Sequence, residues 1–141
     1  MPASAGTIRL VMAAFAFSLA ALFQGFGHAE LRIDFATIKA ELAQRFGASR
    51  VPLANELEQL LADVSNLPAG ERVERINAFF NRHIRYVEDN QLWGRSDYWA
   101  SPVETLGHGA GDCEDFAIAK YVTLREAGID NRQLRLIYVR A

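Results

Sequence analysis

The chain has 141 residues, the length of one ordinary domain, and 50% of them are hydrophobic, which is enough for a modest packed core. Its 15 lysine and arginine residues nearly balance 17 aspartate and glutamate residues, so the formal net charge is only -2. This balance excludes the basic surface typical of nucleic-acid-binding domains, and the sequence contains no polybasic run that would bind an acidic membrane surface.

The first predicted element is an export signal in residues 1–29. A basic residue precedes the apolar run Leu10–Phe23, and Gly27 and Ala29 supply small side chains where a signal peptidase would cut. The run has about 14 residues, fewer than the roughly 20 that span a bilayer, which favours a cleaved signal over a membrane anchor. We therefore expect an exported protein with one mature domain, residues 30–141, and an uncleaved anchor is the alternative.

Three amphipathic helices are predicted next, because apolar residues recur at helical spacing in three consecutive segments. The expected ranges are Leu31–Phe46, about Pro52–Asn66 and about Gly70–Tyr86. Gly47 and Pro68 follow the first two segments as helix stops. The N-terminal half of the mature chain should therefore form a helical layer.

A long connection, Val87–Pro102, carries two tryptophans and a tyrosine, and the sequence leaves open whether these cover the core or form a functional loop. A short helical turn is expected from Pro102 to Leu106. A glycine-rich turn then leads into a helix at about Gly111–Ala127. Leu134–Val139, rich in branched and aromatic side chains, is predicted to be a β-strand.

The single cysteine, Cys113, lies at the predicted start of the helix at 111–127, between acidic residues. The positive end of a helix dipole lowers the pKa of a thiol, whereas neighbouring carboxylates oppose its ionisation. An unpaired thiol is also a liability in an exported protein. Taken alone, Cys113 is either a small buried side chain or a residue retained for its reactivity.

Two histidines remain in the mature chain. His83 falls on the apolar stripe of the third helix and is interpreted as a core or boundary residue. His108 lies in the glycine-rich turn only a few residues before Cys113, and such close chain neighbours seldom meet in nucleophile–base geometry. His108 is therefore interpreted as a polar loop residue.

The segment DYWASPVETLGHGAGDCEDFAIAKY, residues 97–121, closely resembles the bacterial transglutaminase-like cysteine peptidases, and the likeness extends more loosely to the helices before it. The resemblance implies an α+β, papain-like or transglutaminase-like fold, with an N-terminal helical part and the start of an antiparallel sheet, apparently truncated here, against which the nucleophile helix packs. It also implies a Cys-His-Asp triad that hydrolyses a peptide bond. On this resemblance Cys113 is the nucleophile, and backbone N–H groups near it are the oxyanion donors.

The same resemblance implies dependence on Ca²⁺. Asp112 and Glu114 match the calcium ligands of the family, and Asp115 is a weaker candidate. Carbonyls or water would complete the site, since Ca²⁺ takes about six to eight oxygen ligands. A divalent ion would neutralise carboxylates that otherwise oppose a thiolate. The alternative is that the acidic residues only complement the helix dipole.

The implied setting is the periplasm, where the enzyme would control biofilm attachment. Its substrate would be a large surface adhesin cut near its N-terminus, and an inner-membrane receptor responsive to cyclic di-GMP would sequester it. Trp93, Tyr98 and Trp99 are candidates for the contact surface, because an aromatic loop near the nucleophile can anchor a polypeptide.

The sequence departs from the family after the nucleophile, where the family has its histidine and aspartate. No histidine follows His108, and Asp130 comes too early to match the triad aspartate. A single predicted strand would also have no sheet to join. Three hypotheses stay open: the N-terminal part of a calcium-dependent peptidase that lacks its C-terminal strands and is inactive alone, a non-catalytic calcium- and partner-binding module, or an inactive truncation product.

Overall fold

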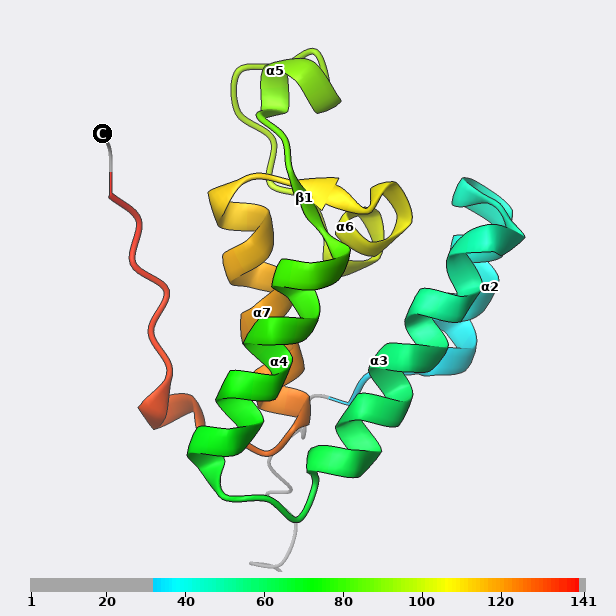
Figure 1. The fold of residues 1–141 in the computed structure, drawn as a ribbon. Helices are drawn as coiled ribbons and strands as arrows, with labels where there is room; N and C mark the ends of the chain where they lie inside the picture. The colour runs from blue at the N-terminus through cyan, green and yellow to red at the C-terminus, as the bar shows by residue number, and fades with distance from the viewer. Residues whose placement is uncertain (1–31, 140–141) are drawn as a thin grey trace, which may run out of the picture. The chain divides into compact units, whose positions relative to one another are not determined.

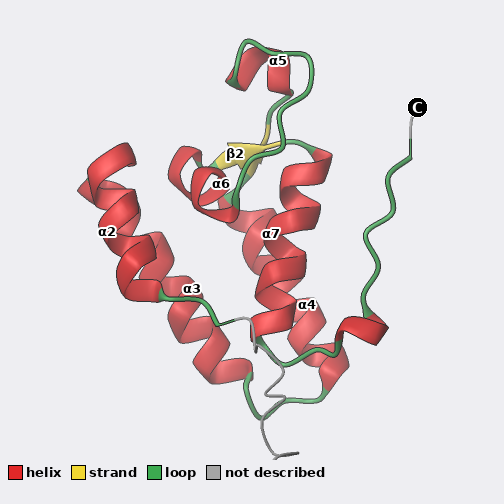
Figure 2. Cartoon of the chain, turned by 180° about the vertical axis from the view of Figure 1, so that it is seen from behind, coloured by secondary structure: helices red, strands yellow, loops and turns green. Residues whose placement is uncertain are grey.

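The computed structural model describes residues 32–139, so the predicted export signal at residues 1–29 lies outside the described residues. Helices make up most of the described chain (Figure 2). The five longer ones are α2 (Phe35–Phe46), α3 (Val51–Val64), α4 (Ala69–His83), α6 (Pro102–His108) and α7 (Cys113–Glu126) (Figure 1). Within residues 32–139, no helix is long and apolar enough to cross a membrane.

The predicted helical layer and the helix that follows Cys113 are confirmed. Asp34 caps α2, where its Oδ1 accepts hydrogen bonds from the N–H groups of Ala36 at 3.1 Å and Thr37 at 3.3 Å. Pro52 lies in the first turn of α3, where a missing N–H costs nothing. Shorter elements complete the chain: 3₁₀-helices at Ala48–Arg50 and Asn131–Gln133, and α5 (Asp89–Leu92) inside the predicted loop.

The helices enclose one hydrophobic core, to which α2, α3, α4, α6 and α7 all contribute. Its most buried large side chains include Leu42, Val64, Ile76, Phe80 and Leu106. α6 lies directly against α2, and a Cβ added to Gly107 would stand 2.4 Å from the ring of Phe46. This close approach fixes α6, and with it the turn that leads to Cys113.

The third helix ends earlier than predicted. α4 stops at His83 because Ile84 adopts extended backbone angles, and Arg85–Tyr86 forms strand β1 instead of a last helical turn. β1 pairs in parallel with β2 (Ala110–Gly111), and Tyr86 lies opposite Gly111. The N–H of Val87 donates to the carbonyl of Gly111 at 3.0 Å. This short ladder joins the end of α4 to the start of α7.

Two expectations about the sheet are wrong. The only sheet among the described residues is parallel, whereas the resemblance implied an antiparallel one. Leu134–Val139 is extended but belongs to no strand (Figure 1, red segment). A strand is defined by its hydrogen-bonded partner, and no other part of residues 32–139 pairs with this segment.

Candidate active site

Cys113 is the first residue of α7, and its free thiol is exposed. This position excludes the interpretation of Cys113 as a small buried side chain. The first N–H groups of a helix have no partner within the helix, and the helix dipole is positive at this end. The sulfur therefore lies next to the positive end of the helix dipole and near the backbone N–H groups of the first helical turn.

A tyrosine that the sequence reasoning missed contacts the sulfur. The hydroxyl of Tyr86 lies 3.8 Å from Sγ of Cys113 and donates a hydrogen bond to Oε1 of Glu88 at 2.7 Å. This bond to Glu88, and secondarily the sulfur, raises the pKa of the Tyr86 hydroxyl. The contact depends on the β1–β2 register, so no local pattern could have shown it.

Asp115 orders the backbone behind the cysteine. Its carboxylate is fully buried; Oδ1 accepts from the N–H of Ala100 at 2.7 Å, and Oδ2 accepts from the N–H of Asp112 at 3.4 Å. Burial raises the pKa of Asp115, although these two backbone hydrogen bonds act to lower it. Gly111 is required here, because a Cβ at that position would lie 2.7 Å from the side chain of Asp115.

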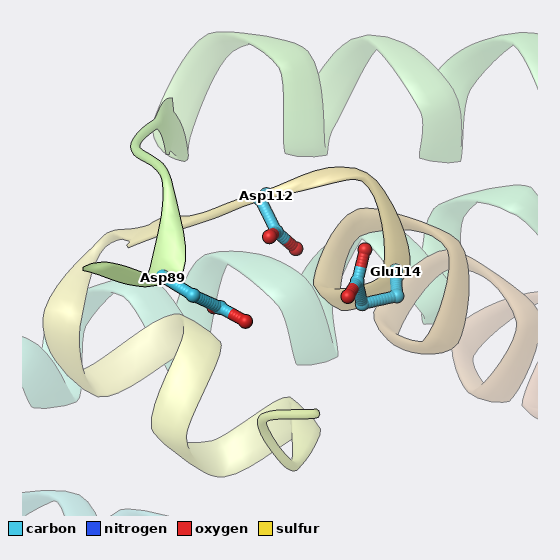
Figure 3. A group of neighbouring side chains, drawn as sticks. All are labelled: Asp89, Asp112 and Glu114. Carbon is cyan, nitrogen blue, oxygen red and sulfur yellow. The ribbon is translucent and has the colours of Figure 1, made fainter. Parts of the chain in front are cut away.

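Three other carboxylates form an acidic cluster: Asp89, Asp112 and Glu114 (Figure 3). One oxygen from each lies within 4.8 Å of the others. Asp112 and Glu114 flank Cys113, as the resemblance implied, whereas Asp89 comes from α5 and is brought alongside by the β1–β2 pairing. Sequence reasoning missed Asp89, and Asp115 lies outside the cluster.

The described chain leaves some buried oxygens of the acidic cluster without hydrogen-bond donors. Asp89 is 4% exposed and Asp112 is 7% exposed, and each has a buried Oδ1 without a hydrogen-bond partner among the described residues. The other oxygen of Asp89 accepts from the N–H of Tyr98. Burial raises the pKa of Asp112 to about 7, and the charge of Asp89 and contact with Glu114 add to this. Buried carboxylate oxygens without donors fit a hard cation such as Ca²⁺.

A cleft of about 870 Å³ opens beside Cys113. Cys113, Glu114 and Ile118 of α7 line one side, and the extended segment at 136–139 lines another. Trp99 also borders the cleft. An extended polypeptide could therefore approach the exposed sulfur along this cleft.

Comparison with known proteins identifies the family to which this arrangement belongs. Residues 58–141 match the family described as bacterial transglutaminase-like cysteine proteinase BTLCP. The chain belongs to this family. Among solved structures it is similar to Legionella pneumophila LapG, with 37% sequence identity and a TM-score of 0.59. The match covers 72% of this chain and 55% of the LapG chain, so this chain spans little more than half of that relative. The comparison with curated proteins gave no match.

Neither histidine of the described chain contacts Cys113. Nε2 of His83 lies 3.4 Å from a carboxylate oxygen of Glu56, and its ring packs on Phe79, as expected of a boundary residue. His108 was expected in a loop but is the last residue of α6, with its ring between Phe46 and Trp93. The described residues therefore place no imidazole at the sulfur.

The three aromatic residues proposed as a contact surface occupy different environments. Trp93 and Tyr98 are half-buried and pack on each other with ring centroids 4.3 Å apart, and the Tyr98 hydroxyl donates to Glu104 at 3.1 Å. Trp99 is 54% exposed. Of the three, Trp99 is the residue that both borders the cleft and is available to a partner.

The raised pKa of Asp112 predicts that the thermal stability of the chain depends on pH. In excess chelator, Asp112→Asn should melt higher than the unchanged chain at pH 8, and the difference should shrink as the pH falls towards 5. The ordinary pKa of Asp112 is 3.8, and its pKa in the folded chain is about 7. Because the folded state holds this proton more tightly, protonation of Asp112 stabilises the fold fully below the ordinary pKa. This stabilisation is lost as the pH rises through the folded pKa. Asparagine remains a good N-cap without the charge.

Thermal melting between pH 5 and pH 8 measures this difference. We expect a few degrees at pH 8, because ~1 kcal/mol shifts the melting temperature of a domain this size by ~4–8 °C. Asp63→Asn, on an exposed position of α3, is the matched control and should show no such trend. A difference for Asp112→Asn that is the same at every pH would contradict the assignment.

Proposed function

We propose that the chain carries the nucleophile and calcium site of an exported, calcium-dependent cysteine peptidase. The observation that supports this most directly is the location of the exposed Cys113 next to two buried carboxylates with unpartnered oxygens. A cysteine kept only for packing would be buried. Acidic residues kept only for the helix dipole would be solvated rather than desolvated without donors.

In this proposal the sulfur of Cys113 attacks the carbonyl carbon of the scissile peptide bond and forms a tetrahedral oxyanion. N–H groups at the start of α7 stabilise the oxyanion, the amine leaves, and water later hydrolyses the thioester. A base must accept the thiol proton and then donate a proton to the leaving amine. In this proposal Cys113 is the nucleophile and N–H groups at the start of α7 are the oxyanion donors, and neither described histidine contacts the sulfur.

Asp89, Asp112 and Glu114 are the residues that would hold Ca²⁺. The ion would supply positive charge to three carboxylates that otherwise repel one another and oppose a thiolate at Cys113. Asp115 has a different role in this proposal, since both of its oxygens accept backbone hydrogen bonds. It positions the backbone on which Asp112 and Cys113 lie.

Calcium should raise the melting temperature of the unchanged chain, because a ligand that binds only the folded state adds RT ln(1 + [L]/Kd) to stability. At a hundredfold excess over Kd this is about 2.7 kcal/mol. The increase should be lost in Asp89→Ala, Asp112→Ala and Glu114→Ala. Melting with Ca²⁺ and with excess chelator measures it.

Asp63→Ala, which removes an exposed carboxylate of α3, should retain the full calcium response. Equal melting temperatures with and without calcium, in the unchanged chain and in all variants, would mean that the acidic residues only complement the helix dipole. If Asp89→Ala keeps the calcium response and Asp112→Ala and Glu114→Ala lose it, then Asp89 is not a calcium ligand and the other two residues remain in the site.

The substrate and partners follow from the family resemblance and remain part of the proposal. The substrate is a large surface adhesin cut near its N-terminus, and a cyclic di-GMP-responsive inner-membrane receptor binds the peptidase to control biofilm attachment. The exposed position of Trp99 at the cleft supports a contact role for this residue. Trp93 and Tyr98 would act by holding the loop that presents it.

We expect this chain to hydrolyse an adhesin N-terminal fragment more slowly than a peptidase with a histidine at its nucleophile, because neither described histidine contacts Cys113. Proton transfer by a positioned base typically contributes ~10²–10⁴-fold, and loss of a triad as a unit costs more than one such factor. The assay measures cleavage with calcium, for the unchanged chain and for Cys113→Ala. Calcium-dependent cleavage that disappears in Cys113→Ala would contradict this expectation and require His83 or His108 to act as the base.

Export should remove residues 1–29, because the apolar run is short and small residues follow it. Intact-mass analysis of protein recovered from the periplasm of an expressing bacterium measures this directly. A mature species that begins at Glu30 is expected. A species that retains Met1 and stays with the membrane would support the anchor instead.

A further inference from the structure

The backbone of the aromatic loop is held on both sides of Trp99. A carboxylate oxygen of Asp89 accepts a hydrogen bond from the N–H of Tyr98, and Oδ1 of Asp115 accepts one from the N–H of Ala100 at 2.7 Å. Both carboxylates belong to buried residues. The residues immediately before and after Trp99 are therefore fixed by side chains of α5 and α7.

The backbone of Trp99 itself is unpaired, because neither its N–H nor its C=O makes a hydrogen bond to a described residue. Residues 97–101 contain no turn or bend, and none of them has a positive φ. In such an extended backbone, successive residues present their N–H and C=O groups to opposite sides. Since the N–H groups of Tyr98 and Ala100 point towards buried carboxylates, the N–H and C=O of Trp99 point to the other side.

Trp99 is also the one residue of 98–100 that lines the cleft beside Cys113. A donor and an acceptor on one residue are what an antiparallel strand pair uses, in which two opposite residues exchange both hydrogen bonds. Proteins that recognise extended polypeptides commonly do so through main-chain hydrogen bonds of this kind. Because its neighbours are fixed, Trp99 offers both groups in one orientation, which lowers the entropy cost of binding.

We propose that the N–H and C=O of Trp99 pair with one residue of an extended polypeptide that lies antiparallel to residues 98–100 in the cleft. The inference deepens the proposed function and rests on it, since the polypeptide is then the substrate of the peptidase. The paired substrate residue cannot be proline, which has no N–H. Its side chain lies beside the indole of Trp99, because the side chains of opposite residues leave the same face.

Two alkylating reagents for Cys113 provide the test. One is acetyl-Ala-Ala-Ala chloromethyl ketone, which carries an extended backbone, and the other is iodoacetamide, which carries none. In each reaction the sulfur forms a bond to the methylene carbon, the halide leaves and the thiol proton passes to solvent. Intact-mass analysis with calcium present gives both rate constants. Their ratio, peptide reagent over iodoacetamide, measures recognition of the peptide separately from the reactivity of the thiol.

Three analogues of the peptide reagent locate the pairing from the substrate side. Each carries an N-methyl group on a different alanine, which removes one N–H. We expect one analogue to lose about fivefold or more of the ratio, because its missing N–H is the donor to the carbonyl of Trp99. The analogues methylated at adjacent alanines should change little, since their N–H groups point away from Trp99.

Two variants test the same pairing from the side of the chain. Trp99→Ala removes the indole and keeps the N–H, whereas Trp99→Pro removes both. We expect the ratio to fall about fivefold further in Trp99→Pro than in Trp99→Ala. Thermal melting shows whether Trp99→Pro has folded. If it has not, the methylated reagents with the unchanged chain still test the same hydrogen bonds.

The alternative outcomes separate this inference from the proposed function. Equal ratios in Trp99→Ala and a folded Trp99→Pro, or three methylated reagents that react alike, overturn the pairing and leave Cys113 as the nucleophile. A full loss already in Trp99→Ala also overturns it, because the indole alone then holds the peptide. A Cys113 that reacts with neither reagent contradicts the proposed function, and the inference that rests on it fails with it.

Discussion

The buried carboxylate of Asp115 holds together the two segments from which the candidate site is built. It accepts one hydrogen bond from the N–H of Ala100, at the end of the aromatic loop, and one from the N–H of Asp112, at the start of α7. Gly111 permits this contact, since any Cβ there would collide with Asp115. Loss of the carboxylate would leave buried N–H groups unpaired and would release Asp112 and Cys113 from their fixed positions.

Unlike Asp115, whose two oxygens both accept hydrogen bonds, the acidic cluster contains buried carboxylate oxygens that have no hydrogen-bond partner among the described residues. Asp89, Asp112 and Glu114 bring three carboxylates within 4.8 Å, and no lysine or arginine of the described chain forms an ion pair with them. The chain therefore concentrates carboxylates beside Cys113, the residue that we propose as the nucleophile. We propose that a bound Ca²⁺ offsets most of this negative charge and stiffens the turn that presents the thiol.

Local sequence patterns predicted the parts of the site that depend on local structure. The helices follow from apolar spacing, and the position of Cys113 at a helix start follows from the residues around it. Asp89 was missed because its contact with Asp112 arises from pairing between β1 and β2, which are distant in sequence. The strand expected at Leu134–Val139 was wrong for a related reason: composition measures strand preference, but a strand also needs a partner.

The central claim is that the three clustered carboxylates share one calcium ion next to an exposed nucleophile. A crystal structure of the chain grown with Ca²⁺ tests this most directly. We predict one ion bound by oxygens of Asp89, Asp112 and Glu114 at ~2.3–2.6 Å, with Cys113 still exposed beside it. Crystals soaked in excess calcium that show no ion there, with the unpartnered oxygens of Asp89 and Asp112 turned to other groups, would contradict the account.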